Sequence, residues 1–131
     1  MMPLLLLATA SADLDAIDQA VARCDRAAVN PAFASESARR SQFLLDAYRE
    51  QEAIVTERLT LSDRRRAARE AGAIKASEDK QLKLQEAAID DRQRALNDRR
   101  MLEGIRQDAM DTMRRYFLTN CPAGSGPERT K

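Results

Sequence analysis

The chain has two cysteines, Cys24 and Cys121, and their chemistry is the easiest to predict from the sequence. Two thiols that meet can form a disulfide, and an even cysteine count in an exported chain favours one. The alternative is a pair of unpaired core residues, because free cysteine packs as a small hydrophobe. A zinc site is disfavoured, since two cysteines in a chain without histidine cannot supply four ligands. We therefore predict a Cys24–Cys121 disulfide.

The carboxylates that could take part in acid–base or metal chemistry lie close to arginines in the sequence. Surface ion pairing accounts for such carboxylates without any site. Histidine, the commonest general base, is absent from the chain. We therefore expect no enzyme activity, no cofactor, no metal and no small-molecule substrate. The carboxylates concerned are Asp90, Asp91, Asp108 and Asp111.

A basic segment follows Asp63 and contains four arginines up to Arg69. The basic region of a leucine-zipper protein would need an unbroken apolar heptad seam after it. Here Gly72 and a polar stretch follow, so a solvated helix face is the better interpretation. The formal net charge of +1 gives no reason to expect nucleic acid or an anionic membrane as partner. If the protein has a partner-contact surface, we expect it to include Arg64, Arg65, Arg66, Arg69, Lys80 and Arg92.

The composition favours an extended helical protein. Charged residues make up 33% of the chain and aromatic residues 4%, with 4 glycines. We predict an all-α fold, a long antiparallel helical hairpin of coiled-coil type, with a short N-terminal helix packed or kinked at its base. The helices are expected at about 13–29, 31–70 and 77–120, with a turn near 71–76.

The third helix has the clearest ends. Ser77 is a good N-cap, and no proline appears before Pro122. Gly72 suits the chain reversal before it, because glycine readily takes the left-handed conformation. The outer half of the helix has a half-polar heptad seam of Leu82, Ile89 and Leu96. The inner half has a core stripe of Leu102, Ile105, Ala109, Met113 and Phe117.

The first two helices also carry apolar stripes. In the first helix, the residues spaced by three and four are Leu14, Ile17, Val21, Cys24 and Ala28. In the second helix, the predicted core stripe is Phe33, Leu44, Tyr48, Val55 and Leu59, widened by Phe43, Leu45, Ile54 and Leu61. Asn30–Pro31 predicts a kink or a sharp turn between these helices, because a residue before proline avoids the α region.

A reversal at Gly72 sets which residues face each other across the hairpin. Facing residues have numbers that sum to about 145, and the two cysteines satisfy this rule. The same rule predicts three apolar contacts, namely Phe43 with Leu102, Leu44 with Met101, and Phe33 with Met113. A sharp fold at Pro31 would require a different geometry for Cys24.

The N-terminus predicts export. Residues 1–12 combine a short apolar run with small residues, which is typical of a signal peptide cleaved after Ala10 or Ala12. No basic residue precedes the run, and an apolar helix end is the alternative. The run is too short for a stable membrane anchor. Residues 122–131 have the composition of a flexible tail. We expect a periplasmic or secreted protein.

These features predict a non-enzymatic protein with a structural or protein-binding role, through a protein partner or self-association. The long hairpin is also similar in architecture to the tentacles of periplasmic chaperones of the Skp/OmpH type. That resemblance implies a holdase chaperone of the cell envelope as the alternative function. The likeness concerns the fold and rests on no residue motif.

Overall fold

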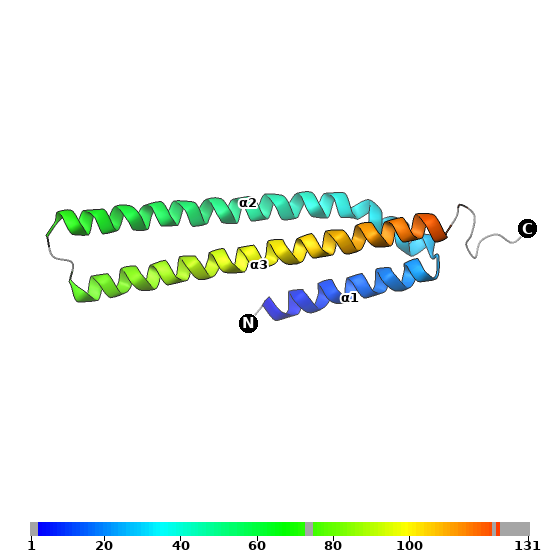
Figure 1. The fold of residues 1–131 in the computed structure, drawn as a ribbon, viewed down its shortest axis with the longest axis horizontal. Coiled ribbons are helices and arrows are strands. Elements are labelled where there is room, and N and C mark those ends of the chain that lie inside the picture. The colour runs from blue at the N-terminus through cyan, green and yellow to red at the C-terminus, as the bar shows by residue number, and fades with distance from the viewer. Residues whose placement is uncertain (1–2, 73–74, 122, 124–131) are drawn as a thin grey trace, which may run out of the picture. The chain divides into compact units, whose positions relative to one another are not determined.

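A computed structural model shows three α-helices: α1 (Pro3–Ala22), α2 (Arg26–Glu70) and α3 (Ala76–Asn120) (Figure 1). The structure describes residues 3–72, 75–121 and 123, and their side chains from residue 13 onward. Within these residues the fold is all-helical and α2 packs against α3, which confirms the predicted all-α class. By its contacts the chain forms two units. The disulfide unit contains residues up to Arg40 and from Gly104, and the hairpin unit contains Ser41–Glu103.

The ends of α2 and α3 lie close to the predicted positions. Helix α2 ends at Glu70 and Gly72 has a φ of 108°, so glycine occupies the left-handed position that closes the helix. Helix α3 begins at Ala76, one residue before Ser77, and the Lys75 carbonyl accepts its first hydrogen bond from the Asp79 N–H at 3.0 Å. The predicted tail, residues 122–131, lies outside the described residues except for Ala123.

The break between α1 and α2 lies at residues 23–25 and not at Asn30–Pro31. The Cys24 N–H donates to the Val21 carbonyl at 3.1 Å, and the Asp25 N–H donates to the Ala20 carbonyl at 2.9 Å. These two bonds form a Schellman motif with Cys24 in the left-handed region at a φ of 53°. The carboxylate of Asp25 then accepts from the Ala28 N–H at 3.3 Å and caps α2.

Pro31 therefore lies inside α2, in its second turn. Proline has no N–H to donate to the backbone carbonyl one turn earlier. Pro31 is so close to the N-terminus of α2 that few helical hydrogen bonds precede it, so the helix is little disturbed. The earlier break changes which residue of this segment is buried. Ala28, predicted in the core stripe, is exposed, and Val29 is fully buried in its place.

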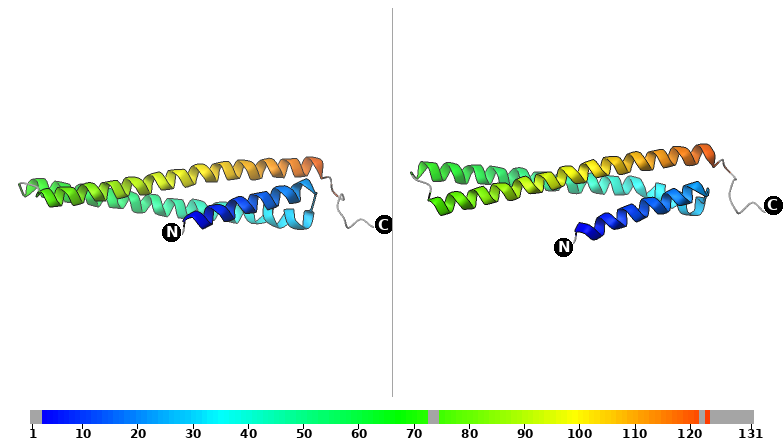
Figure 2. Two further views of the ribbon diagram at one scale, coloured as in Figure 1. Left: turned by 90° about the horizontal axis from the view of Figure 1, so that it is seen from below. Right: turned by 60° about the horizontal axis from the view of Figure 1, so that its bottom comes forward.

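The disulfide unit has a compact apolar core. Segments of all three helices lie side by side in it, as the views in Figure 1 and Figure 2 agree. Its buried members are Ile17, Ala20, Val21, Val29, Met110, Phe117 and Cys121, and Leu14, Phe33 and Met113 pack against them. Phe33 meets Phe117 edge to face, with ring centroids 6.2 Å apart.

The predicted disulfide is present in this unit. Cys24 and Cys121 are bonded, with Cα atoms 5.5 Å apart, so the turn after α1 is tied to the end of α3. Arg26 strengthens the same corner. Its guanidinium donates to the Cys121 carbonyl and lies 5.0 Å from the centroid of the Phe117 ring. A cation at a helix C-terminus also interacts favourably with the helix dipole.

The hairpin unit has a narrow core made from two facing heptads. Leu82, Ile89 and Leu96 of α3 are buried, as their spacing predicts. Ile54 and Leu61 of α2 are buried with them, and Ala47 packs against the cluster. The three α2 positions are also spaced by seven, so the seam places one apolar layer in every two turns of each helix.

The main predicted stripe of α2 is wrong within the hairpin unit. Leu44, Tyr48, Val55 and Leu59 are all exposed, and the residues treated as its margin, Ile54 and Leu61, form the core. The predicted contact between Leu44 and Met101 also fails, since both side chains are exposed. The reason is that α2 carries two apolar stripes, and α3 offers a matching heptad to only one of them.

The inner stripe predicted for α3 is wrong in part. Met113 and Phe117 lie in or against the core of the disulfide unit, together with Met110. Ile105, which belongs to the same unit, is exposed. Leu102 of the hairpin unit is exposed as well. Met110 takes the core position because it shares a helix face with Phe117 and Cys121, at spacings of seven and four.

Candidate functional site

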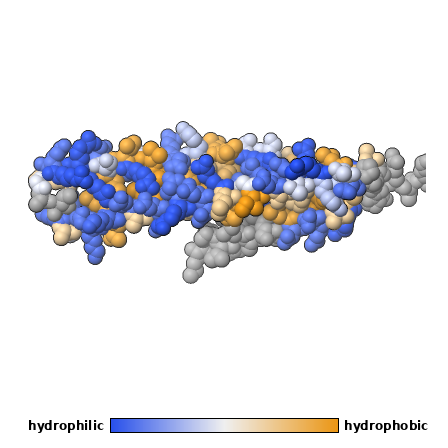
Figure 3. Space-filling view, in the orientation of Figure 1, coloured by the Kyte–Doolittle hydropathy of each residue, from blue (hydrophilic) through white to orange (hydrophobic). Residues whose placement is uncertain are grey.

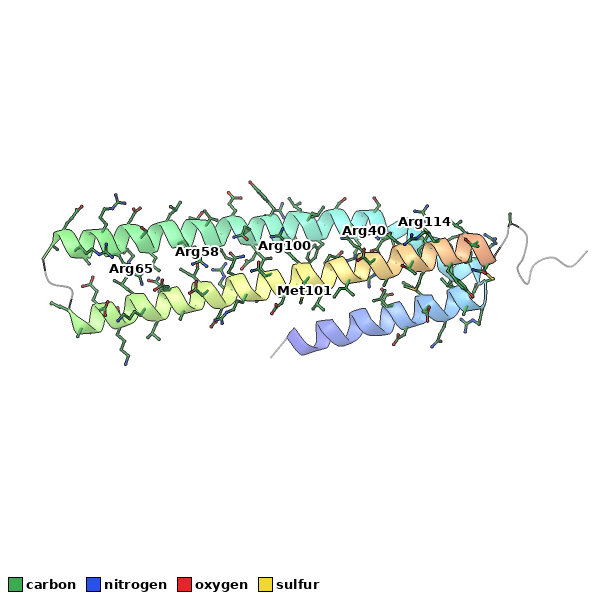
Figure 4. All side chains as sticks on the ribbon, in the orientation of Figure 1. Arg40, Arg58, Arg65, Arg100, Met101 and Arg114 are labelled. Carbon is green, nitrogen blue, oxygen red and sulfur yellow. A yellow bond between two sulfur atoms is a disulfide. The ribbon has the colours of Figure 1, made fainter. Side chains whose placement is uncertain are left out.

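The predicted basic surface lies in the hairpin unit, and three of its arginines bridge α2 and α3. Arg65 pairs with Glu86 at 2.6 Å, and Figure 4 shows Arg65 on the side of α2 that faces α3. Arg92 of α3 pairs with Glu50 at 3.1 Å and with Glu57 at 2.6 Å. These side chains therefore hold the two helices together.

The other predicted contact residues are more exposed. Arg64 donates to Gln85 of α3 at 3.0 Å, while Arg66 pairs with Asp63 one turn earlier on the same helix. Arg69 and Lys80 lie exposed near the two ends of the turn between α2 and α3. The structure thus brings the six residues to one unit, but it uses Arg64, Arg65 and Arg92 in contacts between α2 and α3.

The cross-helix pairs shift the pKa values of their partners. Hydrogen bonding to Arg65 lowers the pKa of Glu86, and hydrogen bonds to Glu50 and Glu57 raise the pKa of Arg92. A further polar layer joins Gln51 to Gln93 by two reciprocal amide hydrogen bonds of 2.8 and 3.0 Å. Polar layers therefore alternate with the apolar layers of the seam and specify its register.

A buried carboxylate lies in the disulfide unit. Glu36 is 7% exposed, and it accepts hydrogen bonds from Arg39 at 2.7 Å and from Arg40 at 3.3 Å. Arg106 of α3 lies 3.5 Å from the same carboxylate. Burial opposes ionisation of Glu36, but the arginines outweigh it, chiefly Arg39, and its pKa is lowered.

The arginines around Glu36 reach further carboxylates. Arg40 pairs with Asp111 at 2.9 Å, and Arg106 pairs with Asp13 at 3.2 Å. The Nε atom of Arg106 is buried and finds no hydrogen-bond partner among the described residues. The network contains one residue of α1, three of α2 and two of α3, so its evident role is to fix the three helices of this unit. Sequence reasoning missed it because its members are far apart in the chain.

The described residues form neither a metal-binding cluster nor a membrane-spanning helix. They contain no group of three or more His, Cys, Asp or Glu side chains that could hold a metal ion. An open hollow of about 260 Å³ lies in the hairpin unit among Arg64, Glu78, Gln81, Leu82 and Gln85. Arg64 and Gln85 already hydrogen-bond each other there. Among the same described residues, no helix is both long and apolar enough to cross a bilayer.

An apolar face on α2 in the hairpin unit is left unexplained by the fold. We call it the α2 apolar face. Its side chains are Leu44 at 65% exposure, Tyr48 at 68%, Val55 at 48% and Leu59 at 63%. At about 100° per residue they lie within about 60° of one another around the helix. Figure 3 shows apolar side chains exposed among hydrophilic ones on the surface that it draws.

A weaker apolar stripe lies on α3 of the same unit. Leu84 and Leu102 are exposed, with Ala88 and Ala95 between them at helical spacing. In an antiparallel helix pair, the positions of this stripe and of the α2 apolar face point to opposite sides of the hairpin. The hairpin unit therefore presents apolar side chains on two sides, and the larger group is on α2.

The sequence contained the signal for this face. The spacing of its four members predicts a core stripe, because most amphipathic helices bury their larger stripe. Ile54 and Leu61 are seven residues apart, and so are Leu82, Ile89 and Leu96 of α3. This shared spacing identifies the two stripes that form the seam.

Comparisons with known proteins place the chain in no family. No protein-family model matches it, and no curated protein sequence and no solved structure matches it significantly. What the chain does must therefore be inferred from its own geometry.

Proposed function

We propose that this chain is an exported, non-enzymatic helical-hairpin protein of the periplasm whose role is to bind protein. The single observation that carries the proposal is the α2 apolar face. Four large apolar side chains are about half to two thirds exposed on one helix, although the same helix buries Ile54 and Leu61 in a seam. Large exposed apolar side chains gathered on one helix face among polar residues are a mark of interaction sites.

Export is supported by the N-terminal segment and by the disulfide. Disulfides persist in oxidising compartments, and residues 1–12 have the apolar run and small residues of a signal peptide. Cleavage after Ala10 or Ala12 leaves Leu14, Ile17 and Val21 in the chain.

The export part of the proposal is tested by cell fractionation and intact-mass measurement of the native protein. We expect the protein in the periplasmic fraction, with a mature chain that begins at Ser11 or Asp13. Recovery of the chain in the cytoplasm with residues 1–12 attached would reject this part.

The binding part is tested by placing a photo-reactive amino acid at Tyr48 and irradiating living cells. We expect discrete protein adducts, because this position lies in the α2 apolar face. The control position is Asp98, which is exposed on α3 of the same unit and should give few adducts. Equal labelling at both positions, or none at Tyr48, would reject the α2 apolar face as a binding surface.

A holdase chaperone of the Skp/OmpH type is the second candidate. The observation that favours it is the presence of apolar side chains on two sides of the hairpin unit, which suits an unfolded chain that follows the helices. The test is suppression of aggregation of an unfolded outer-membrane protein. A holdase should lose this activity when Leu44 and Leu59 are both replaced by Ser, whereas unchanged aggregation with the wild-type protein would reject the candidate.

A further inference from the structure

Helix α3 contains a glycine that packing does not require. Gly104 is exposed inside the helix, and a Cβ atom added to it would meet no atom of the described residues within 4 Å. Glycine is a poor helix former, because it loses more backbone freedom on folding than any other residue. The fold therefore keeps a weak helical residue at a position where alanine would fit.

Gly104 lies where α3 passes from one compact unit to the other. The contacts divide α3 between Glu103 and Gly104. They divide α2 between Arg40 and Ser41. Both helices continue through these positions without a break. Each helix therefore belongs to two separately packed groups of residues, and the glycine lies at the boundary in α3.

The apolar core is interrupted around this boundary. In α3 the buried apolar residues of the hairpin unit end at Leu96, and those of the disulfide unit begin at Met110. The interval 97–109 is fully described, and no apolar side chain in it is buried. Close-packed apolar cores deform little, so a helix is held straight where it contributes to one. Gly104 lies near the middle of an interval without that support.

The α2 segment next to the same boundary is rich in serine. Ser35, Ser37 and Ser41 lie within about two helical turns. The Ser35 hydroxyl donates to the Ala32 carbonyl at 3.1 Å. A serine hydroxyl that bonds to the carbonyl of the preceding turn competes with the backbone and often bends a helix. Both helices thus contain residues that ease bending near this boundary.

We propose that α3 is a jointed helix, which bends at Gly104 while the two apolar cores stay intact. Glycine widens the range of backbone angles at the joint, and its missing side chain lets water reach the neighbouring helical hydrogen bonds. The joint lets the hairpin unit change direction without unfolding. It goes beyond the proposed binding role and does not depend on it.

Residual dipolar couplings of the backbone amides test the joint in the oxidised full chain. A lanthanide tag on an added cysteine, Leu84→Cys, aligns the hairpin unit, since Leu84 is 61% exposed there. We expect the couplings of residues 106–119 to have a smaller amplitude than those of residues 95–102, because bending averages them. Equal amplitudes in the two parts of α3 would overturn the joint, since the helix would then be rigid.

Gly104→Ala tests whether the glycine is the cause. Alanine fits the open space and is the best helix former, so the two amplitudes should become equal. Amide hydrogen exchange next to position 104 should slow by about fivefold, the factor that corresponds to the alanine–glycine difference in helix propensity. A reduced amplitude that persists in Gly104→Ala would overturn the assignment of the joint to Gly104.

The matched control moves the glycine into the seam. Ala95 is exposed on α3 beside the buried Leu96, so Ala95→Gly is added to the Gly104→Ala chain, and residues 97–102 are compared with 106–119. The amplitudes should stay equal, because the apolar layers hold the helix on both sides of position 95. The couplings of residues before and after position 95 should also agree. A loss of amplitude across position 95 as large as the wild-type loss across Gly104 would overturn the proposal, since any glycine in α3 would then act as a joint.

Discussion

The assignment of the seam in the hairpin unit can be tested with two leucines of α2 that lie two residues apart. Leu61 is 6% exposed and packs with Ile54 and Leu82, whereas Leu59 is 63% exposed on the α2 apolar face. Both substitutions to alanine remove the same three carbon atoms from the same helix. Differences in helix propensity therefore cancel, and burial is the remaining variable.

The expected losses follow from that burial. Leu61→Ala loses about 2.4 kcal/mol of transfer free energy, at about 0.8 kcal/mol for each of three carbons. The cavity that it leaves adds a further loss, which is small because the narrow seam can partly collapse into the space. We expect a decrease of about 2–3 kcal/mol in the free energy of unfolding. Leu59→Ala removes atoms that are mostly in water, so its loss should stay below about 1 kcal/mol.

The assay is urea denaturation followed by circular dichroism at about 2 μM protein, where self-association contributes little. A double-mutant cycle with Leu82→Ala adds a second test. Leu61 and Leu82 should be coupled by more than about 0.5 kcal/mol, and Leu59 and Leu82 should be additive. Equal losses for the two leucines, or a larger loss at Leu59, would show that the seam is assigned to the wrong face.

Three further predictions concern the polar and covalent contacts. Because the pKa of Glu36 is lowered in the fold, its stabilisation is present above the unfolded value of about 4.3 and is lost as pH falls below it. Glu36→Gln should therefore destabilise the protein at pH 7, by about 2–4 kcal/mol, and flatten the acid limb of a urea-melt pH series. Arg92→Ala should lower the urea midpoint in dilute buffer and lower it less in about 1 M NaCl, since its ion pairs are partly exposed and salt screens them. Reduction of Cys24–Cys121, which spans 97 residues, should cost at most about 4–5 kcal/mol, and the untreated protein should show the two-proton mass deficit of one disulfide.

The parts of the fold that sequence reasoning predicted are those governed by local rules. The end of α2, the left-handed Gly72 and the heptad of Leu82, Ile89 and Leu96 each depend on residues within a few turns. The disulfide was predictable for a related reason. Once the reversal is placed at Gly72, antiparallel pairing fixes which ends of the chain meet.

The parts that were missed depend on contacts between segments or on an unusual residue. A Schellman turn is usually marked by glycine, because a side chain disfavours the left-handed conformation, so Cys24 gave no sign of the break at 23–25. Which of two stripes on α2 is buried depends on α3, and helix periodicity alone carries no such information. The network around Glu36 is likewise invisible until three helices are brought together.

The polar layers explain how this hairpin unit can leave its larger apolar stripe exposed. Its seam contains only one apolar layer in seven residues of each helix, and Gln51–Gln93, Arg65–Glu86 and Arg92 with its two glutamates occupy the intervening positions. Shifting α2 to bury Leu44, Tyr48 and Leu59 against α3 would break these pairs and would also remove Ile54 and Leu61 from the apolar layers of the seam. The polar layers thus select the smaller stripe for the fold. The larger stripe contributes little to folding of the hairpin unit, so it can be used for binding.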